Sequence, residues 1–257
     1  MVDLNVDSRV IRDIELVIFD KDGTLMELYY YWSQMVALRA RLICEQCGLE
    51  QQQHEHDLMH VMGVDVQSRR LRPQGPVGLK KREIVLQAAV DYLTEIGIPG
   101  ANGLCNDVFD EIDRRSLFLL DTLIKPIEGA SSLLRILRDS NCKVAIATTD
   151  RGERARLAMD FLGFGDRVDL VVGVDGVSRP KPDPEMIHVI LETLRIDRSN
   201  TATVGDALTD VKMGLNAGLK ASIGVLTGFG RYEEFAALTP YIAHSVAGIK
   251  VMRKGDV

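Results

Sequence analysis

The sequence lacks long apolar runs and any recognisable targeting segment. No apolar stretch approaches the roughly 18 residues that a membrane-spanning helix requires. The first residues, Met1-Val2-Asp3-Leu4, are acidic and contain neither the basic nor the apolar region of a secretory signal. These absences predict a cytoplasmic protein with no membrane partner.

Cysteine is also scarce, with four residues in a chain of 257, which argues against a disulfide scaffold. Cys44 and Cys47 have the spacing of a metal-binding pair, but no second pair follows at a zinc-site distance. His54, His56 and His60 include an i,i+4 pair on an expected helix. We expect surface or helix-capping roles for these histidines rather than metal binding.

The chain has no excess of positive charge: 31 basic residues face 37 acidic ones, a net charge of -6. This balance argues against nucleic acid or an anionic membrane as a main partner. It does not exclude a small phosphorylated metabolite, because a few local cations and a metal ion can hold one. The oligomeric state, monomer or homodimer, stays open.

What the sequence does contain is an apolar, largely β-branched run at Leu16–Phe19, which predicts a strand buried on both faces. Two carboxylates, Asp20 and Asp22, follow it one residue apart, and Gly23 permits a sharp turn. Alternate side chains of an extended chain point the same way, so this acid pair can face one point. A divalent cation could neutralise the pair while one carboxylate attacks phosphorus. An ordinary Asp-Gly turn is the alternative interpretation.

From residue 130 onward, strand and helix patterns alternate regularly, which predicts a parallel sheet with helices on both faces. This is a Rossmann-like α/β fold. The expected strands lie near residues 142–150, 168–172, 201–204 and 221–226, and the expected helices near 130–139, 153–162, 184–194 and 209–217. The tail, 231–257, is expected to hold a short helix, a small strand at 241–243 and a polar end. Residues 1–14 are interpreted as a polar, partly disordered lead-in.

Between about residues 33 and 123 helical spacing dominates, which predicts an inserted all-helical domain. We expect a core domain of residues 1–26 and 125–257 and an inserted domain of residues 27–124. Within the insert, the segment Arg69–Arg82 gathers cations in a Pro- and Gly-rich loop. Arg70 and Arg72 could reach an anionic substrate, and a solvated charged surface is the equal alternative.

Polar residues follow the other expected strands too: Thr148 and Thr149 after the second, Lys181 between two prolines, and Asp206 with Asp210 further on. The carboxyl ends of parallel strands share one edge of a sheet, so these residues can converge with Asp20 and Asp22. Acids, a hydroxyl and a cation are what a metal-assisted phosphoryl transfer needs, with oxygen ligands for Mg²⁺.

Three segments carry a resemblance to the haloacid dehalogenase (HAD) superfamily. They are Asp20-Lys21-Asp22-Gly23-Thr24-Leu25, Lys181-Pro182-Asp183-Pro184 and Val204-Gly205-Asp206-Ala207-Leu208-Thr209-Asp210. The last is similar to the fourth motif of phosphoglycolate-phosphatase-like members, and the helical insert resembles the family's type-1 cap. The resemblance covers nearly the whole chain.

The resemblance implies a role for each matching residue. Asp20 would be the nucleophile that forms an aspartyl-phosphate, and Asp22 the general acid and base. Thr148 and Lys181 would bind the phosphoryl group, with Lys21, Gly23 and Thr149 beside it. Mg²⁺ would be held by Asp20, the Asp22 backbone carbonyl and Asp206, with Asp210 acting through water or Lys181.

The sequence departs from the family pattern in the second motif, where Thr148 is followed by Thr149-Asp150 in place of the usual asparagine. The leading hypothesis is a Mg²⁺-dependent phosphatase acting on a small-metabolite phosphate monoester. A phosphomutase of the β-phosphoglucomutase type and a non-catalytic HAD-like binding protein stay open as alternatives. A phosphonatase would need a Schiff-base lysine, for which Lys80 or Lys81 could be nominated.

Overall fold

The apolar run Leu16–Phe19 forms β3, an inner strand of a six-stranded sheet in a computed structural model that describes residues 1–253. The strand order is β10-β9-β8-β3-β6-β7, and every neighbouring pair is parallel. All four residues of β3 are buried, as expected for a strand covered on both faces. The other strands are β6 (Lys143–Ala147), β7 (Leu170–Val172), β8 (Thr201–Gly205), β9 (Ala221–Val225) and β10 (Ile242–Ala243).

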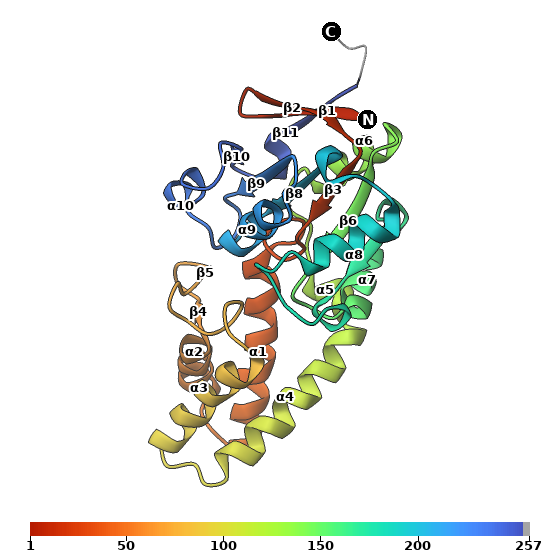
Figure 1. The fold of residues 1–257 in the computed structure, drawn as a ribbon. Coiled ribbons are helices and arrows are strands. Elements are labelled where there is room, and N and C mark those ends of the chain that lie inside the picture. Colours follow the sequence, from red (N-terminus) through yellow and green to blue (C-terminus); the bar gives the residue numbers. More distant parts are fainter. Residues whose placement is uncertain (254–257) are drawn as a thin grey trace. The chain divides into compact units, whose positions relative to one another are not determined.

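Helices flank this sheet on both sides (Figure 1). Leu16 and Ile18 point to one face, where they pack with Met186 and Ile190 of α8 and Met213 of α9. The alternate strand residues point to the opposite face because side chains alternate along a strand. The helices are α6 (Ala130–Asp139), α7 (Gly152–Phe161), α8 (Glu185–Leu194), α9 (Leu208–Asn216) and α10 (Tyr232–Ala236). The predicted Rossmann-like α/β fold is confirmed.

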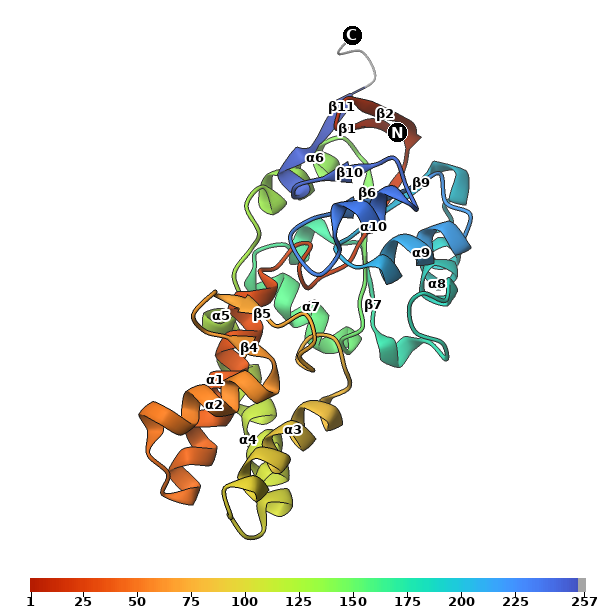
Figure 2. The same cartoon turned by 90° about the vertical axis from the view of Figure 1, so that its left-hand side faces the viewer.

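Residues 1–14 are not the disordered lead-in that we expected. They form a hairpin of β1 (Val2–Val6) and β2 (Arg9–Ile14), and β11 (Ile249–Arg253) pairs with β1 to complete a three-stranded antiparallel sheet. The strand β1 alternates buried and half-buried residues, which is the pattern of a sheet with one covered face. Figure 2 shows the three strands side by side. The expected polar end of the tail is a strand as far as residue 253, and its last four residues lie outside the described residues.

Contacts divide the chain into two compact units, one of Met1–Glu27 with Lys125–Val257 and one of Leu28–Ile124. The second unit is built from α1 (Leu28–Cys47), α2 (Gln51–Met62), α3 (Arg82–Glu95), α4 (Ala101–Phe118) and α5 (Leu120–Leu123). It also contains a short antiparallel ribbon of β4 (Val64–Asp65) and β5 (Arg70–Leu71) that the helical pattern did not predict.

A charged cluster ties three helices of the second unit together. The buried guanidinium of Arg39 in α1 donates to Asp113 of α4 at 2.7 Å, and Arg82 of α3 donates to the other oxygen of Asp113 at 2.8 Å. Both guanidinium groups lie against the ring of Phe109. A buried charge is tolerated only with partners, and Asp113 supplies one to the arginines of both α1 and α3.

Within the described residues, no helix combines the length and the apolar character that crossing a bilayer requires.

Candidate active site

The carboxyl ends of the central strands bring the first set of polar residues together. Phe19, the last residue of β3, is in register with Ile146 of β6 and Val204 of β8. Asp20 is therefore level with Ala147 and Gly205, the last residues of β6 and β8, and Thr148 and Asp206 follow one residue later. This edge, where the strand order reverses, is where open α/β sheets bind ligands.

Lys181 joins two carboxylates of this edge. Its ammonium group donates to Asp20 Oδ1 at 2.6 Å and to Asp210 Oδ1 at 2.7 Å, and all three side chains are buried. The second oxygen of Asp210 accepts a hydrogen bond from the backbone N–H of Ala207 at 2.9 Å, so Asp210 also caps the start of α9. Asp210 is thus fixed at both oxygens, whereas the structure gives Asp20 Oδ2 no partner among residues 1–253.

Burial controls the charges of this cluster. It raises the pKa of Asp20 to about 7, although the neighbouring Lys181 acts in the opposite direction. Burial and the charges of Asp20 and Asp210 likewise raise the pKa of Asp206. Burial alone would lower the pKa of Lys181, but the two carboxylates outweigh it and raise that pKa above its ordinary value. The site therefore holds more buried carboxylate than its lysine can neutralise.

The chemistry of these groups fits a divalent cation. Asp20, Asp206 and Asp210 each offer a carboxylate oxygen, and these oxygens lie within 4.8 Å of one another. Three carboxylates against one ammonium group leave two negative charges, which a divalent ion would balance. Hard cations such as Mg²⁺ prefer oxygen ligands of this kind.

Residues to which the sequence analysis gave no role beside Asp206 hold this side chain in place. The hydroxyl of Thr24 donates to Asp206 Oδ1 at 3.3 Å, and the backbone N–H of Phe229 donates to Oδ2 at 3.1 Å. A Cβ on Gly23, whose φ is +83°, would lie 2.6 Å from the Asp206 carboxylate, and one on Gly228 would lie 1.7 Å from it. The signal for Gly23 and Thr24 was their place in the first motif; nothing in the sequence identified Phe229.

The ammonium group of Lys21 lies against two carboxylates outside the group of Asp20, Asp206 and Asp210. Its Nζ lies 2.8 Å from Asp22 Oδ1 and 3.3 Å from Asp150 Oδ2, and its side chain is 2% exposed. Asp22 is half-buried and has no side-chain oxygen in the three-carboxylate group. The sequence analysis noted Asp150 only as a departure from the family pattern, and the structure shows it as a partner of Lys21.

The two threonines after β6 differ in exposure. Thr148 is buried and Thr149 is exposed. Thr148 Oγ1 accepts a hydrogen bond from the backbone N–H of Asp150 at 3.1 Å, which leaves the hydroxyl hydrogen of Thr148 available to an oxygen ligand. This geometry favours Thr148 over Thr149 as the phosphate-binding hydroxyl, a role that stays a prediction.

The remaining candidates all lie in the second unit. Arg70 is exposed on β5, and Arg72 donates to the backbone carbonyl of His60 at 2.9 Å near the end of α2. Nδ1 of His54 lies 2.7 Å from the hydroxyl of Tyr92, so this histidine has a hydrogen-bonding role. Among residues 1–253, the group of Asp20, Asp206 and Asp210 is the set that meets the spacing of a metal site; Cys44, Cys47 and the histidines do not join one.

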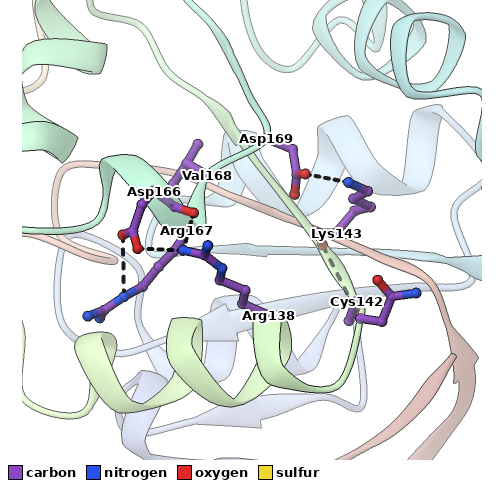
Figure 3. A pocket seen from close by; sticks show the side chains of 8 residues that line it. Arg138, Cys142, Lys143, Asp166, Arg167, Val168 and Asp169 are labelled. Atoms are coloured by element: carbon purple, nitrogen blue, oxygen red, sulfur yellow. Dashed lines mark hydrogen bonds and ion pairs between the residues drawn. The ribbon is translucent and has the colours of Figure 1, made fainter.

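A separate cavity of about 360 Å³ lies at the opposite edge of the sheet, where β6 begins (Figure 3). Its cations are already paired with its own carboxylates: Arg138 with Asp166 at 2.5 Å, and Lys143 with Asp169 at 2.6 Å. This cavity does not take part in the site described above.

The family assignment agrees with this geometry. The sequence model of the haloacid dehalogenase-like hydrolases matches residues 14–218, and the chain belongs to this family. Among solved structures, a HAD-superfamily hydrolase of subfamily IA from Geobacter sulfurreducens superimposes with a TM-score of 0.66 and 18% identity, over 91% of this chain and 94% of that one. At that identity the likeness supports the fold alone.

Curated relatives share parts of the sequence. A pyrophosphatase, PpaX, from Halalkalibacterium halodurans is 32% identical over 103 residues, which is 40% of this chain and 48% of that protein. A phosphoglycolate phosphatase from Rhodobacter capsulatus is 28% identical over 185 residues, or 66% of this chain and 83% of that protein. The chain spans about half the length of the first curated relatives that it matches.

Proposed function

We propose that this protein is a Mg²⁺-dependent phosphatase that hydrolyses a phosphate monoester of a small cytoplasmic metabolite through an aspartyl-phosphate on Asp20. The observation that carries the proposal is the buried Asp20–Lys181–Asp210 bridge beside Asp206, at the ligand-binding edge of the sheet. The family assignment and the phosphatases among the relatives support the same reaction class.

In the first step, Asp20 Oδ2 attacks phosphorus, because Oδ1 is held by Lys181. The bond between phosphorus and the ester oxygen breaks, and protonated Asp22 gives its proton to the departing oxygen. Lys181 and the hydroxyl of Thr148 offset the charge that gathers on the phosphoryl oxygens, which is the main requirement of this kind of transfer.

In the second step, water attacks the phosphorus of the aspartyl-phosphate while Asp22 accepts its proton. The acyl-phosphate bond breaks, inorganic phosphate leaves and the Asp20 carboxylate is restored. Asp20, Asp206 and the backbone carbonyl of Asp22 would hold Mg²⁺, with Asp210 fixing Lys181 beside them. The metal ion would offset charge on the phosphoryl oxygens and on the nucleophile.

The test is phosphate release from a panel of esters with Mg²⁺ and then with EDTA. The panel includes pyrophosphate, phosphoglycolate and sugar phosphates, since relatives named for the first two exist. We expect metal-dependent release that is abolished in Asp20→Asn, with an unchanged circular dichroism spectrum. Isomer formation without phosphate release would instead indicate a mutase, and no Mg²⁺ binding or turnover would favour a binding protein.

A further inference from the structure

Lys21 presents an unusual electrostatic arrangement. It is a lysine with a 2% exposed side chain, placed between the proposed nucleophile and the proposed acid/base in the chain. Burying an ammonium group is costly unless carboxylates compensate it. The bridge at Lys181 already uses Asp20 and Asp210, so Lys21 needs partners of its own.

Those partners are Asp22 at 2.8 Å and Asp150 at 3.3 Å. Asp150 is itself fixed on the loop after β6. Its Oδ1 accepts the backbone N–H of Arg151 at 2.8 Å, and its own N–H donates to Thr148 at 3.1 Å. Arg154 of α7 lies 3.7 Å from Asp150 Oδ2. Asp150 is therefore a second carboxylate partner of the Lys21 ammonium group.

The contact has a direct consequence for Asp22. Lys21 engages Oδ1, and within residues 1–253 the Asp22 carboxylate has no other hydrogen bond or ion pair. Because Lys21 occupies Oδ1, Oδ2 is the oxygen that is left for proton transfer to a substrate. An acid that must reach a departing oxygen gains from such orientation.

We propose that Lys21 is a positioning residue that orients the Asp22 carboxyl group by holding Oδ1, which leaves Oδ2 for proton transfer, and that Asp150 holds Lys21 for this purpose. The inference rests on the proposed function, in which Asp22 protonates the leaving group. Lys21 acts through Asp22 and does not touch the reacting atoms.

The test compares two substrates that differ in whether their leaving group needs a proton from Asp22. An alkyl phosphate has a poor leaving group that requires protonation, whereas p-nitrophenyl phosphate has a good one that does not. In Lys21→Met we expect the ratio of kcat/KM for p-nitrophenyl phosphate to that for the alkyl ester to rise about tenfold to a hundredfold, a part of what general acid catalysis supplies. Lys21→Arg should restore most of the ratio.

A matched control is Lys143→Met, which removes another ion-paired lysine at the opposite edge of the sheet (Figure 3). This variant should leave the ratio unchanged. If Lys21→Met changes kcat/KM for both esters by the same factor, the positioning role is wrong. It is also wrong if Lys143→Met shifts the ratio of the two kcat/KM values as much as Lys21→Met does.

Asp150→Asn keeps the inference testable if Lys21→Met does not fold, because the Asp150 side chain is 22% exposed. It should shift the ratio in the same direction as Lys21→Met. Added to Lys21→Met, it should cause no further shift, since coupled residues are not additive. An equal effect of Asp150→Asn on both esters, or full additivity in the double variant, would overturn the chain Asp150–Lys21–Asp22.

Asp22→Asn separates failure of the inference from failure of the proposed function. If Asp22→Asn lowers kcat/KM equally for both esters, Asp22 is not the general acid, and the proposed mechanism and the inference fall together. If Asp22→Asn is selective for the alkyl ester while Lys21→Met and Asp150→Asn are not, the proposed function stands and only the inference is refuted.

Discussion

At the scale of single residues, the candidate site contains more negative than positive charge. Asp20, Asp206 and Asp210 are all buried beside one lysine. Such a cluster does not favour folding, because each buried carboxylate destabilises the native state unless something neutralises it. This electrostatic cost should therefore be measurable as a lower free energy of unfolding, without any substrate.

The raised pKa of Asp20 predicts how stability depends on pH when metal is removed. The pKa rises from 3.8 to about 7, chiefly through burial. Between these values the unfolded chain has released the proton that the folded protein still binds, so the contribution of Asp20 to the free energy of unfolding falls as pH rises and is lowest above pH 7. Asp20→Asn removes this dependence. Its stability relative to wild type should therefore increase by up to about 4 kcal/mol from pH 4 to pH 7.5.

The measurement is urea unfolding of both proteins in EDTA across this pH range. Taking the difference between them cancels the contributions of titrating groups that do not interact with Asp20. Asp107→Asn, which changes an exposed carboxylate of α4, should follow wild type at every pH. A flat difference for Asp20→Asn, or one that grows toward low pH, would contradict the prediction.

Whether the sequence could reveal a part of the site depends on how far apart along the chain the contacting residues lie. Asp20 and Asp22 follow a recognisable strand, and the segments around Lys181 and Asp206 carry motifs, so the residues of the cluster were identifiable. The contact of Lys21 with Asp150 spans 129 positions of the chain. No periodicity or motif encodes it, because it depends on how two loops at neighbouring strand ends meet. The backbone N–H of Phe229 that binds Asp206 was invisible for the same reason.

At the scale of elements, the buried parallel strands were predictable from the sequence. The three-stranded sheet of β1, β2 and β11, called the terminal sheet below, was not. A strand such as β3, which is apolar throughout, stands out in any window of the sequence. In contrast, β1 alternates apolar residues with Asp3 and Asn5, which made the acidic start look unstructured. The period-two pattern was present, but its partner β11 lies at the other end of the chain, where no local signal connects the two.

The terminal sheet should contribute substantially to stability. Leu4 is fully buried, with 0% exposure, whereas Val10 on the neighbouring strand is 43% exposed. We expect Leu4→Ala to lower the free energy of unfolding by about 2–5 kcal/mol, the usual cost of truncating a buried leucine. Val10→Ala should change it by less than about 0.5 kcal/mol. Urea unfolding measures the free energy of unfolding of both variants. Similar small changes in both would show that the terminal sheet contributes little to stability.

At the scale of the whole molecule, the two units contain different kinds of functional groups. The first holds the groups of the proposed chemistry, which any phosphate ester can use. The second has no catalytic motif, and the cations of the segment Arg69–Arg82 are its main feature that suits an anionic substrate. If substrate choice lies there, a change in the second unit should alter KM for some substrates and not for others.

Arg70 and Arg72 allow this idea to be tested because the structure distinguishes them. Arg70 is exposed, whereas Arg72 supports the end of α2 through the carbonyl of His60. We predict that Arg70→Glu raises KM about fivefold for phosphoglycolate, whose leaving group is anionic, and changes it little for p-nitrophenyl phosphate. Reversing one charge near an exposed anion alters the interaction by roughly 1 kcal/mol, about that factor. Added salt should reduce the effect through screening. Arg72→Ala should instead lower the melting temperature. An equal change in KM for both esters would place Arg70 on a solvated surface without a role in substrate choice.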